Sequence, residues 1–441
     1  MFIGKKVLVC GLARSGAAAA ALLKKHGAIV TGTDTNANIN ILDEINLRLG
    51  KTPDEFVHEY DLIIISPGIS VYASFVQKAH ELGIPVWGEA ELAYAFCPCP
   101  IIAITGTNGK TTVTTLVGEI LKLYNAGTVV AGNIGIPLTG LVDGLNESNI
   151  VVAEISSFQL ETIQNFRPKI SAVLNMSPDH LDRHGSMEVY IATKEKIFKN
   201  QRQNDKVVLN YDNSVTKNMR PLCDVVYFSK QTELKSGVFV RNKAIYATSD
   251  LAVNSELPIA SFTDFKMMTE NALAAVAICL LAGVSVSHIR MGLKSFKGAE
   301  HRLELVSTID GVEYYNDSKA TNVDAAVRAL ESFTHPVVLI AGGSEKGADF
   351  TPWVWLFKEK VSYLVLIGET AEKISKECML AGFVNFELAD SLEAAVNTAK
   401  QKASRTVLFS PACASFDMFK DFEDRGRQFK ELVLSMYYVI S

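Results

Sequence analysis

The sequence predicts an α/β protein built from parallel sheets with helices on both faces, divided into three domains. Strand-like apolar runs alternate with helix-like runs almost throughout the chain, which is typical of such sheets. The chain has 441 residues, and at about 150 residues per domain this length suggests three domains. We expect a Rossmann-like domain over residues 1–96, a central domain of the phosphate-loop ATPase type over 97–300, and a Rossmann-like C-terminal domain over 301–441.

The composition is that of an ordinary globular protein, with 48% hydrophobic and 21% charged residues. Lys and Arg number 43 against 48 Asp and Glu, a net charge of −5, so the sequence predicts no nucleic-acid-binding surface. Seven cysteines, an odd number, favour reduced thiols in the cytoplasm over a disulfide framework. Cys97-Pro98-Cys99 fits neither a redox pair nor half of a zinc site, and we interpret it as a linker.

No membrane segment is expected. The start of the chain lacks the apolar core and cleavage site of a signal peptide. The longest apolar helical run, residues 272–284, is too short to span a bilayer and suits a buried helix. We therefore predict a cytoplasmic protein. Separately, we expect the protein to be a monomer.

The first domain opens with a strand at residues 7–10, a glycine-containing turn, an Ala-rich helix and a second strand at 29–33 that ends before Asp34. This order is similar to a dinucleotide-binding fingerprint, but Ala13 replaces its middle glycine, so the signal is weak. The turn either holds a nucleotide diphosphate or is a plain turn without a ligand. A further strand, 62–66, leads into Pro67-Gly68, at the sheet edge where ligands sit in open sheets.

The most informative segment is Ile102–Thr112, in which an apolar strand meets a glycine-rich turn and then a helical pattern. Backbone N–H groups of such a turn, and the start of the helix after it, bind phosphate. The usual motif has a glycine where Ile104 stands, so this is a particular subtype, although an ordinary strand–turn–helix is the alternative. The predicted ATP-binding residues here are Gly106, Thr107, Asn108, Gly109, Lys110, Thr111 and Thr112, of which Lys110 would reach the outer phosphates and Thr111 would ligate Mg²⁺.

Polar residues follow the next predicted strands, 128–131, 151–155 and 172–175. Since parallel strands end at one edge of a sheet, these residues can converge on the nucleotide. They are Asn133, Glu154, Ser156, Gln159 and His180, with Lys194 on the following helix. Glu154 could bind Mg²⁺. His180 could ligate a second metal or form a hydrogen bond to a reacting carboxylate. Lys194, taken alone, has the pattern of an ordinary helix lysine.

The third domain carries three polar loops after apolar strands, at residues 315–322, 342–350 and 410–417. Their glycines and small residues allow the backbone to approach an anion. Arg302 lies at the start of this domain. A hairpin is predicted earlier, over residues 238–247 around Asn242-Lys243.

Read together, these segments closely resemble the Mur ligases of peptidoglycan synthesis, over essentially the whole chain. The motifs shared in type are Thr-Gly-Thr-Asn-Gly-Lys-Thr-Thr, Asp-His-Leu-Asp-Arg-His and Asn-Asp-Ser-Lys-Ala-Thr-Asn. Residues 410–426 look like the D-glutamate-adding member of that family. The resemblance implies that ATP phosphorylates the carboxylate of UDP-N-acetylmuramoyl-L-alanine, that the amine of D-glutamate attacks the acyl phosphate, and that phosphate leaves.

The resemblance also implies roles for individual residues. Lys110, Glu154, His180 and Lys194 would be catalytic; two Mg²⁺ sites are expected, with Thr111 and Glu154 at the first and His180 and a carbamylated Lys194 at the second. Nucleotide contacts would come from Asn271, Arg302 and Asp317. Substrate contacts would come from Ala13, Arg14, Asp34, Thr35, Gly68, Asn133, Ser156, Gln159, Lys319, Thr321, Lys346, Ser415 and Phe422.

One departure from the family pattern is Met267-Met268, which stand where His-Asn is frequent. Neither Met replaces an amide's hydrogen bonds, which puts the adenine contact there in doubt. The alternatives are another Mur ligase or a folylpolyglutamate-type amide ligase, a regulatory ATPase, and a nicotinamide dehydrogenase. The dehydrogenase is weakened by Ala13 and leaves the Lys110 loop unexplained.

Overall fold

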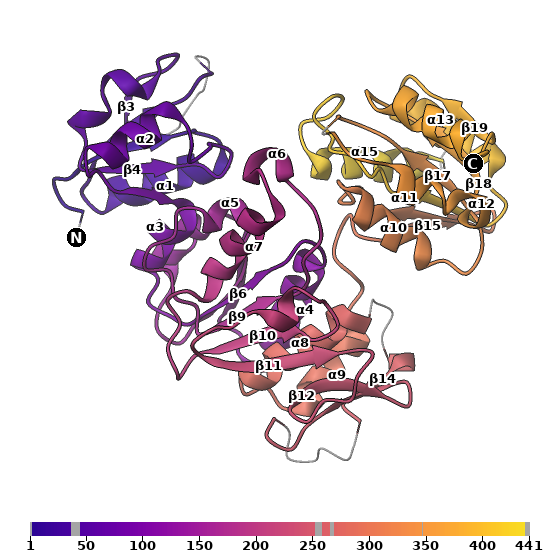
Figure 1. The fold of residues 1–441 in the computed structure, drawn as a ribbon, viewed down its shortest axis with the longest axis horizontal. Coiled ribbons are helices and arrows are strands. Elements are labelled where there is room, and N and C mark those ends of the chain that lie inside the picture. The colour runs from indigo at the N-terminus through magenta and orange to yellow at the C-terminus, as the bar shows by residue number, and fades with distance from the viewer. Residues whose placement is uncertain (1, 37–44, 252–257, 265–268, 346, 437–441) are drawn as a thin grey trace. The chain divides into compact units, whose positions relative to one another are not determined.

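The residues that the structure describes form three sheets in two compact units, seen as a ribbon in Figure 1. The computed structural model describes residues 2–36, 45–251, 258–264, 269–345 and 347–436. One unit spans Met1–Lys297 and contains the first two sheets; the other spans Gly298–Ser441 and contains the third. The predicted α/β class with three domains is confirmed, while the predicted domain boundaries stay a prediction.

The first sheet has the strand order β3-β2-β1-β4-β5, and its paired strands run parallel. Its strands are β1 (Lys6–Cys10), β2 (Ile29–Thr33), β3 (Asn46–Leu47), β4 (Leu62–Ile65) and β5 (Val86–Gly88), and its helices are α1 (Arg14–Lys25), α2 (Ser74–Glu81) and α3 (Glu89–Phe96). The apolar run that predicted β1 is buried along Val7–Cys10. The turn between β1 and α1 therefore lies at the carboxyl edge of the sheet, as predicted.

The central sheet has the order β14-β13-β12-β11-β10-β9-β6-β8-β7. Its strands are β6 (Ile101–Thr105), β7 (Thr128–Gly132), β8 (Ile150–Glu154), β9 (Ile170–Val173), β10 (Lys206–Asn210), β11 (Asp224–Ser229), β12 (Gly237–Arg241), β13 (Ala244–Ala247) and β14 (Ala260–Ser261). The pairs from β7 to β12 are parallel. β12 and β13 form the predicted antiparallel hairpin, and Asn242 and Lys243 turn it with φ of 49° and 56°.

Helices cover the central sheet and complete its core. They are α4 (Lys110–Tyr124), α5 (Ser157–Leu160), α6 (Leu181–His184), α7 (Met187–Glu195), α8 (Thr269–Leu281) and α9 (Val286–Ser295). One apolar cluster joins α4, α8 and α9 to the sheet, and a second joins α3 and α7 to it. The predicted buried helix is α8, whose residues from Ala272 to Cys279 are all buried. In the part of the chain described, no helix is long and apolar enough to cross a membrane.

The third sheet has the order β15-β16-β20-β17-β18-β19, with β15 and β16 antiparallel and the other pairs parallel. Its strands are β15 (Glu304–Ile309), β16 (Val312–Asn316), β17 (Val337–Ala341), β18 (Val361–Leu366), β19 (Phe386–Leu388) and β20 (Thr406–Phe409). Its helices are α10 (Val323–Glu331), α11 (Thr351–Val354), α12 (Phe357–Lys360), α13 (Ala371–Leu380), α14 (Leu392–Lys402) and α15 (Phe422–Ser435).

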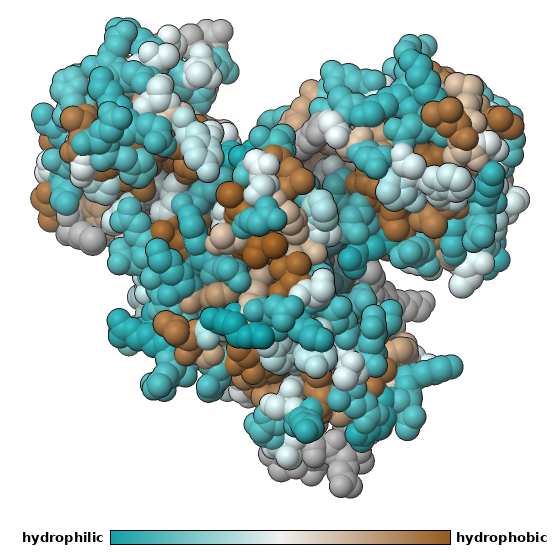
Figure 2. Space-filling model, viewed as in Figure 1, coloured by the Kyte–Doolittle hydropathy of each residue, from teal (hydrophilic) through white to brown (hydrophobic). Residues whose placement is uncertain are grey.

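On the surface, hydrophilic residues cover most of the side of the molecule shown in Figure 2, with hydrophobic patches between them.

Candidate active site

The phosphate loop lies between β6 and α4. Its two glycines have positive φ angles, which residues with a side chain rarely adopt. Gly106 has φ 148° and Gly109 has φ 84°. A Cβ on Gly106 would come within 3.2 Å of the backbone nitrogen of Leu174. The loop is braced by Asn175, whose carbonyl accepts from Thr107 N at 3.0 Å and whose side-chain oxygen accepts from Asn108 N at 2.8 Å. The start of α4 is thereby fixed in the geometry that binds anions elsewhere.

Beside the loop, one buried carboxylate receives two side-chain donors. Glu154, at the end of β8, is fully buried. Its Oε2 accepts from Thr111 Oγ1 at 2.7 Å and its Oε1 from Asn133 Nδ2 at 2.8 Å. Lys110 Nζ lies back over the loop and donates to the carbonyls of Gly106 and Thr107 at 2.9 and 2.7 Å. Predicted residues from two loops and a helix thus meet at one edge of the sheet.

Lys194 lies under the same loop, from α7, and is 1% exposed. Its Nζ donates to the carbonyl of Gly106 at 2.9 Å and to Thr105 Oγ1 at 3.3 Å, and it lies 4.9 Å from the centroid of the Tyr190 ring. Burial, helped by the cation of Lys110, lowers the pKa of Lys194 well below 10.5, and Asp179 and Glu154 oppose this only in part. The folded protein therefore makes the Lys194 ammonium easier to deprotonate than that of an exposed lysine.

His180 precedes α6 with a left-handed backbone, φ 54°. Its side chain is 35% exposed, its Nε2 lies 3.7 Å from Asp179 Oδ2, and its ring centroid is 4.8 Å from that of Phe158. No role was predicted from the sequence for Arg183, which belongs to the same Asp-His-Leu-Asp-Arg-His motif. It donates to the carbonyl of Ile69 at 2.8 Å, which joins the loop after β4 to the central sheet.

The predicted substrate residues of the first domain surround the turn after β1. Asp34 Oδ2 accepts from Leu12 N at 2.7 Å, so this carboxylate shapes the turn. Arg14 donates through its guanidinium to the carbonyl of Gly135, in the loop that also carries Asn133. Ala13, Thr35 and Gly68 are exposed along this edge. The turn of the first sheet and the glycine loop after β7 therefore lie together within one unit.

Ser156 and Gln159 make a reciprocal cap at the start of α5. Ser156 Oγ accepts from Gln159 N at 3.2 Å, and Gln159 Oε1 accepts from Ser156 N at 2.9 Å. Gln159 Nε2 also donates to Glu89 Oε2 at 3.2 Å. Much of the hydrogen-bonding capacity of both side chains is therefore used within the fold.

Two further predicted nucleotide residues lie close to the phosphate loop. Thr112, in the first turn of α4, is 7% exposed. Asn271 packs its side-chain oxygen against Gly109, where a Cβ would collide with it. Met267 and Met268 lie outside the described residues.

In the second unit, Asp317 follows β16 and is fully buried. Its carboxylate accepts from Ser410 Oγ at 2.8 Å and from Leu303 N at 3.2 Å, and its Oδ1 lies 3.7 Å from Arg302 Nη1. Burial raises the pKa of Asp317, and Arg302 counters part of the rise. The loops after β16 and β20 are joined through this carboxylate.

The predicted D-glutamate residues lie around the start of α15. Lys319 Nζ lies 4.9 Å from the ring centroid of Phe422, and Ser415 is 1% exposed. Thr321 donates its N–H to the carbonyl of Lys319 at 2.9 Å. Lys346 lies outside the described residues.

Arg425 was not singled out from the sequence, although it falls in the 410–426 segment. It is fully buried and donates to Ser318 Oγ, Ser318 O, Ala414 O and Cys413 O at 2.9, 2.7, 3.0 and 3.1 Å. Burial lowers the pKa of Arg425 to about 10, so it stays protonated at neutral pH. Arg425 holds the loops after β16 and β20 against each other.

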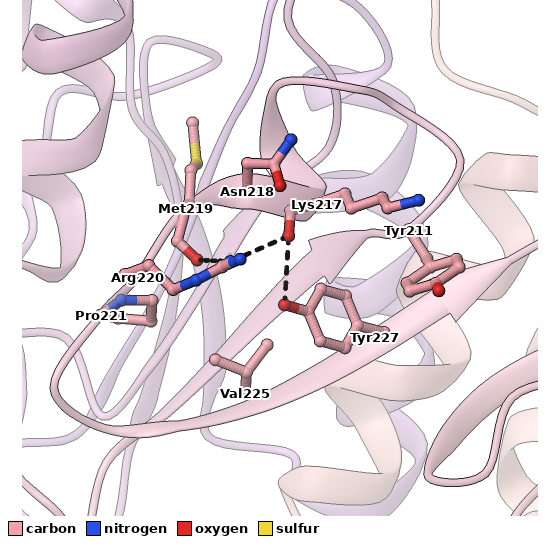
Figure 3. A pocket seen from close by; sticks show the side chains of 8 residues that line it. All are labelled: Tyr211, Lys217, Asn218, Met219, Arg220, Pro221, Val225 and Tyr227. Carbon is pink, nitrogen blue, oxygen red and sulfur yellow. Dashed lines mark hydrogen bonds between the residues drawn. The ribbon is translucent and has the colours of Figure 1, made fainter.

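A separate pocket of about 360 Å³ lies beside β10 and β11 in the central domain (Figure 3). Arg220 Nη1 donates hydrogen bonds to the carbonyls of Lys217 and Met219, at 3.1 and 2.9 Å. Lys217 Nζ lies 4.7 Å from the ring centroid of Tyr211. None of the predicted site residues that the structure describes lines this pocket. We therefore take the phosphate loop and the residues around Lys110 and Lys194 as the candidate active site.

Comparisons with known proteins assign three long segments of the chain to one family. Residues 104–279 match the Mur ligase middle domain, residues 301–413 the Mur ligase glutamate ligase domain, and residues 5–88 the N-terminal domain of MurD-like Mur ligases. Solved structures share the fold at low identity. A UDP-N-acetylmuramate-alanine ligase from Thermotoga maritima has a TM-score of 0.62 at 19% identity, over 98% of this chain and 100% of its own.

Two curated relatives are much more similar in sequence. The UDP-N-acetylmuramoylalanine–D-glutamate ligase of Caldicellulosiruptor bescii is 46% identical over 98% of this chain and 97% of its own length. The enzyme of the same name from Koribacter versatilis is also 46% identical, over 98% of each chain. The chain therefore belongs to the Mur ligase family, among the UDP-N-acetylmuramoylalanine–D-glutamate ligases.

Proposed function

We propose that this chain uses ATP to join D-glutamate to the alanine carboxylate of UDP-N-acetylmuramoyl-L-alanine. The observation that carries the proposal is the buried Lys194 amine directly under a phosphate loop, beside the buried Glu154 carboxylate. The names of the relatives support the choice of substrates. Its location in the cytoplasm and its monomeric state remain predictions.

The phosphate loop suits a nucleoside triphosphate. The N–H groups at the start of α4 and the Lys110 ammonium bind the phosphate oxygens, and Asn271, Arg302 and Asp317 take the adenine and ribose side. The donor set of Glu154 and Thr111 is oxygen only, which fits Mg²⁺. When bound, Mg²⁺ neutralises charge on the transferring phosphoryl group.

Lys194 would serve as a carbamate. Its neutral amine can add to carbon dioxide with release of a proton, which turns a group that repels cations into an anion that binds them. Together with His180, this carbamate would hold a second Mg²⁺. A protonated lysine has no lone pair to offer a metal, so a lowered pKa is the property this role requires.

The remaining residues position the two substrates. Those assigned to the UDP end are Ala13, Arg14, Asp34, Thr35 and Gly68; those near the muramoyl peptide are Asn133, Ser156 and Gln159; those for D-glutamate are Lys319, Thr321, Lys346, Ser415 and Phe422. The alanine carboxylate attacks the γ-phosphorus of ATP, and ADP leaves. The amine of D-glutamate then attacks the acyl phosphate and displaces inorganic phosphate, giving an amide.

A product assay with several amino acids tests the proposal. The purified chain receives ATP, Mg²⁺ and UDP-N-acetylmuramoyl-L-alanine with D-glutamate, L-glutamate, L-alanine or a diamino acid, and the product masses are measured. We expect the D-glutamate adduct alone. Addition of a different amino acid would support another ligase of the family, and hydrolysis of ATP without any adduct would support a regulatory ATPase.

A further inference from the structure

The Cys-Pro-Cys segment between the first and central sheets is a chemical feature that the proposed ligase reaction does not use. Cys97 follows the last residue of α3, and Cys99 lies two residues before β6. Their sulfur atoms are 3.6 Å apart. The other five cysteines of the chain are buried single thiols.

The local sequence explains why the two thiols meet. Pro98 and Pro100 disfavour helical backbone at the residues before them, which ends α3 and constrains the segment that carries Cys97 and Cys99. Cys97 has φ −74° and ψ 116°. The chain then bends at Cys99, which allows the two side chains to approach each other. The two prolines and the bend therefore place both thiols on one short, constrained segment, with their sulfur atoms 3.6 Å apart.

The thiols also open onto a cavity of about 690 Å³. Its walls include Trp87, Tyr94 and Arg167 as well as both cysteines. The cavity lies beside Ile101 and Lys169, at the start of β6 and just before β9. This is the amino end of the parallel strands, whereas the phosphate loop follows their carboxyl end. A reagent can thus reach the thiols without entering the candidate active site.

We propose that Cys97 and Cys99 form a reversible dithiol–disulfide site that reacts with low-molecular-weight disulfides. Cys97 is the more exposed of the two and attacks first, as a thiolate, forming a mixed disulfide and releasing one small thiol. The thiolate of Cys99 then attacks the Cys97 sulfur, forms the internal disulfide and releases the second small thiol. Two protein thiols are oxidised, one small disulfide is reduced to two thiols, and the protons of Cys97 and Cys99 end on those thiols.

The geometry also predicts when the disulfide forms. The sulfurs must move from 3.6 Å to about 2.05 Å, and the ring closed across a single intervening residue is small and strained. Strained disulfides are more easily reduced. Burial and the neighbouring Cys97 raise the pKa of Cys99 to about 12, which slows the second step near neutral pH. The site is therefore reduced under ordinary cytoplasmic conditions and oxidised only when small disulfides accumulate.

Oxidised and reduced glutathione at graded ratios, with the reduced full chain, test the site. Free thiols are then alkylated, and the peptide that carries both cysteines is weighed. We expect an unalkylated peptide about 2 Da lighter than the dithiol form, restored by excess reduced glutathione. Cys99→Ser should stop at the glutathione adduct, and Cys223→Ser, a buried control, should behave as the wild type. Independent alkylation of both thiols at every ratio, or a persistent glutathione adduct in the wild type, would overturn the proposal.

Phenylarsine oxide supplies a second readout that needs no oxidant, because trivalent arsenic binds paired thiols. We expect one molecule bound per chain, and at least about 100-fold weaker binding in Cys97→Ser and in Cys99→Ser, since the second thiol acts at a high effective concentration. Equal binding by the wild type and both variants would contradict a paired site. Neither experiment depends on ATP or on amide formation, so its result is independent of the proposed ligase activity.

Discussion

Among the residues that the structure describes, each unit buries one lysine or arginine side chain, and the two side chains differ in their hydrogen-bond partners. Lys194, in the first unit, is 1% exposed, and Arg425, in the second, is fully buried. The Lys194 amine has two neutral oxygen partners and a pKa far below that of an exposed lysine. Arg425 distributes its forked donors over four oxygens of two loops and keeps its charge. A buried lysine can lose its proton and react, whereas a buried arginine fixes structure.

Replacing Lys194 should have the largest effect. We expect Lys194→Ala to lower kcat/KM by about 1,000-fold, or about 4 kcal/mol, because the proposed carbamate and the metal site that it would form are lost. Added bicarbonate should not restore activity, but a short carboxylic acid that occupies the vacated space should restore part of it. Lys199→Ala, an exposed neighbour, is the control. Near-normal turnover by Lys194→Ala would remove the carbamate from the mechanism.

Replacing Arg425 should change stability first. In Arg425→Ala the carbonyls of Cys413, Ala414 and Ser318 lose a buried donor, and we expect the free energy of unfolding to fall by about 3 kcal/mol. Urea unfolding measures this loss, and the KM for D-glutamate should rise because two loops are released. Arg427→Ala removes an exposed arginine two residues away and should cost less than about 0.5 kcal/mol. Equal stability of the two variants would mean that Arg425 does not hold the loops.

Glu154 should matter for catalysis with little effect on folding. Glu154→Gln keeps the size of the side chain but removes the negative charge of the carboxylate. The oxygens of this carboxylate accept hydrogen bonds from Thr111 and Asn133. We expect kcat/KM to fall by about 100-fold and the Mg²⁺ concentration for half-maximal activity to rise about tenfold. Glu147→Gln, at an exposed position, is the matched control. An unchanged Mg²⁺ requirement would separate Glu154 from the metal.

The smallest expected effect is a pH dependence of stability. Below pH 10.5 the unfolded chain protonates Lys194, and the folded chain does not until the pH falls below its lowered pKa. The unfolded state then binds more protons, so stability rises with pH across that window, by at most about 1.4 kcal/mol per pH unit. Urea unfolding at several pH values, in buffers free of carbon dioxide, measures the slope. Lys194→Met should flatten it, and identical slopes in both proteins would mean that the buried amine keeps its proton.

The sequence predicted the elements whose pattern is local. The strand 29–33 and the hairpin turn at Asn242-Lys243 are found where they were predicted, because apolar alternation and turn residues act over a few positions. The strand predicted at 172–175 instead spans Ile170–Val173, since Asn175 leaves the sheet to brace the phosphate loop. The edge strand β3 has two residues and too little pattern to be recognised.

The candidate site was predictable only as far as residue types at strand ends allow. The contacts of Glu154 with Thr111 and Asn133 join residues far apart in the sequence, and only the topology of the sheet brings them together. Ser156 and Gln159 were recognised as polar residues after a strand, but their mutual cap depends on the helix that follows. The role of Arg425 depends on which loops α15 passes under, and no local pattern contains that information.

The central claim is that the alanine carboxylate is activated by phosphorylation, and the fate of its oxygens tests this claim most directly. UDP-N-acetylmuramoyl-L-alanine is prepared with both carboxylate oxygens labelled with a heavy isotope and is turned over with ATP and D-glutamate. Inorganic phosphate is then collected and weighed. We predict that each phosphate carries one labelled oxygen and the amide keeps the other. Unlabelled phosphate, formed together with the adduct, would contradict the account.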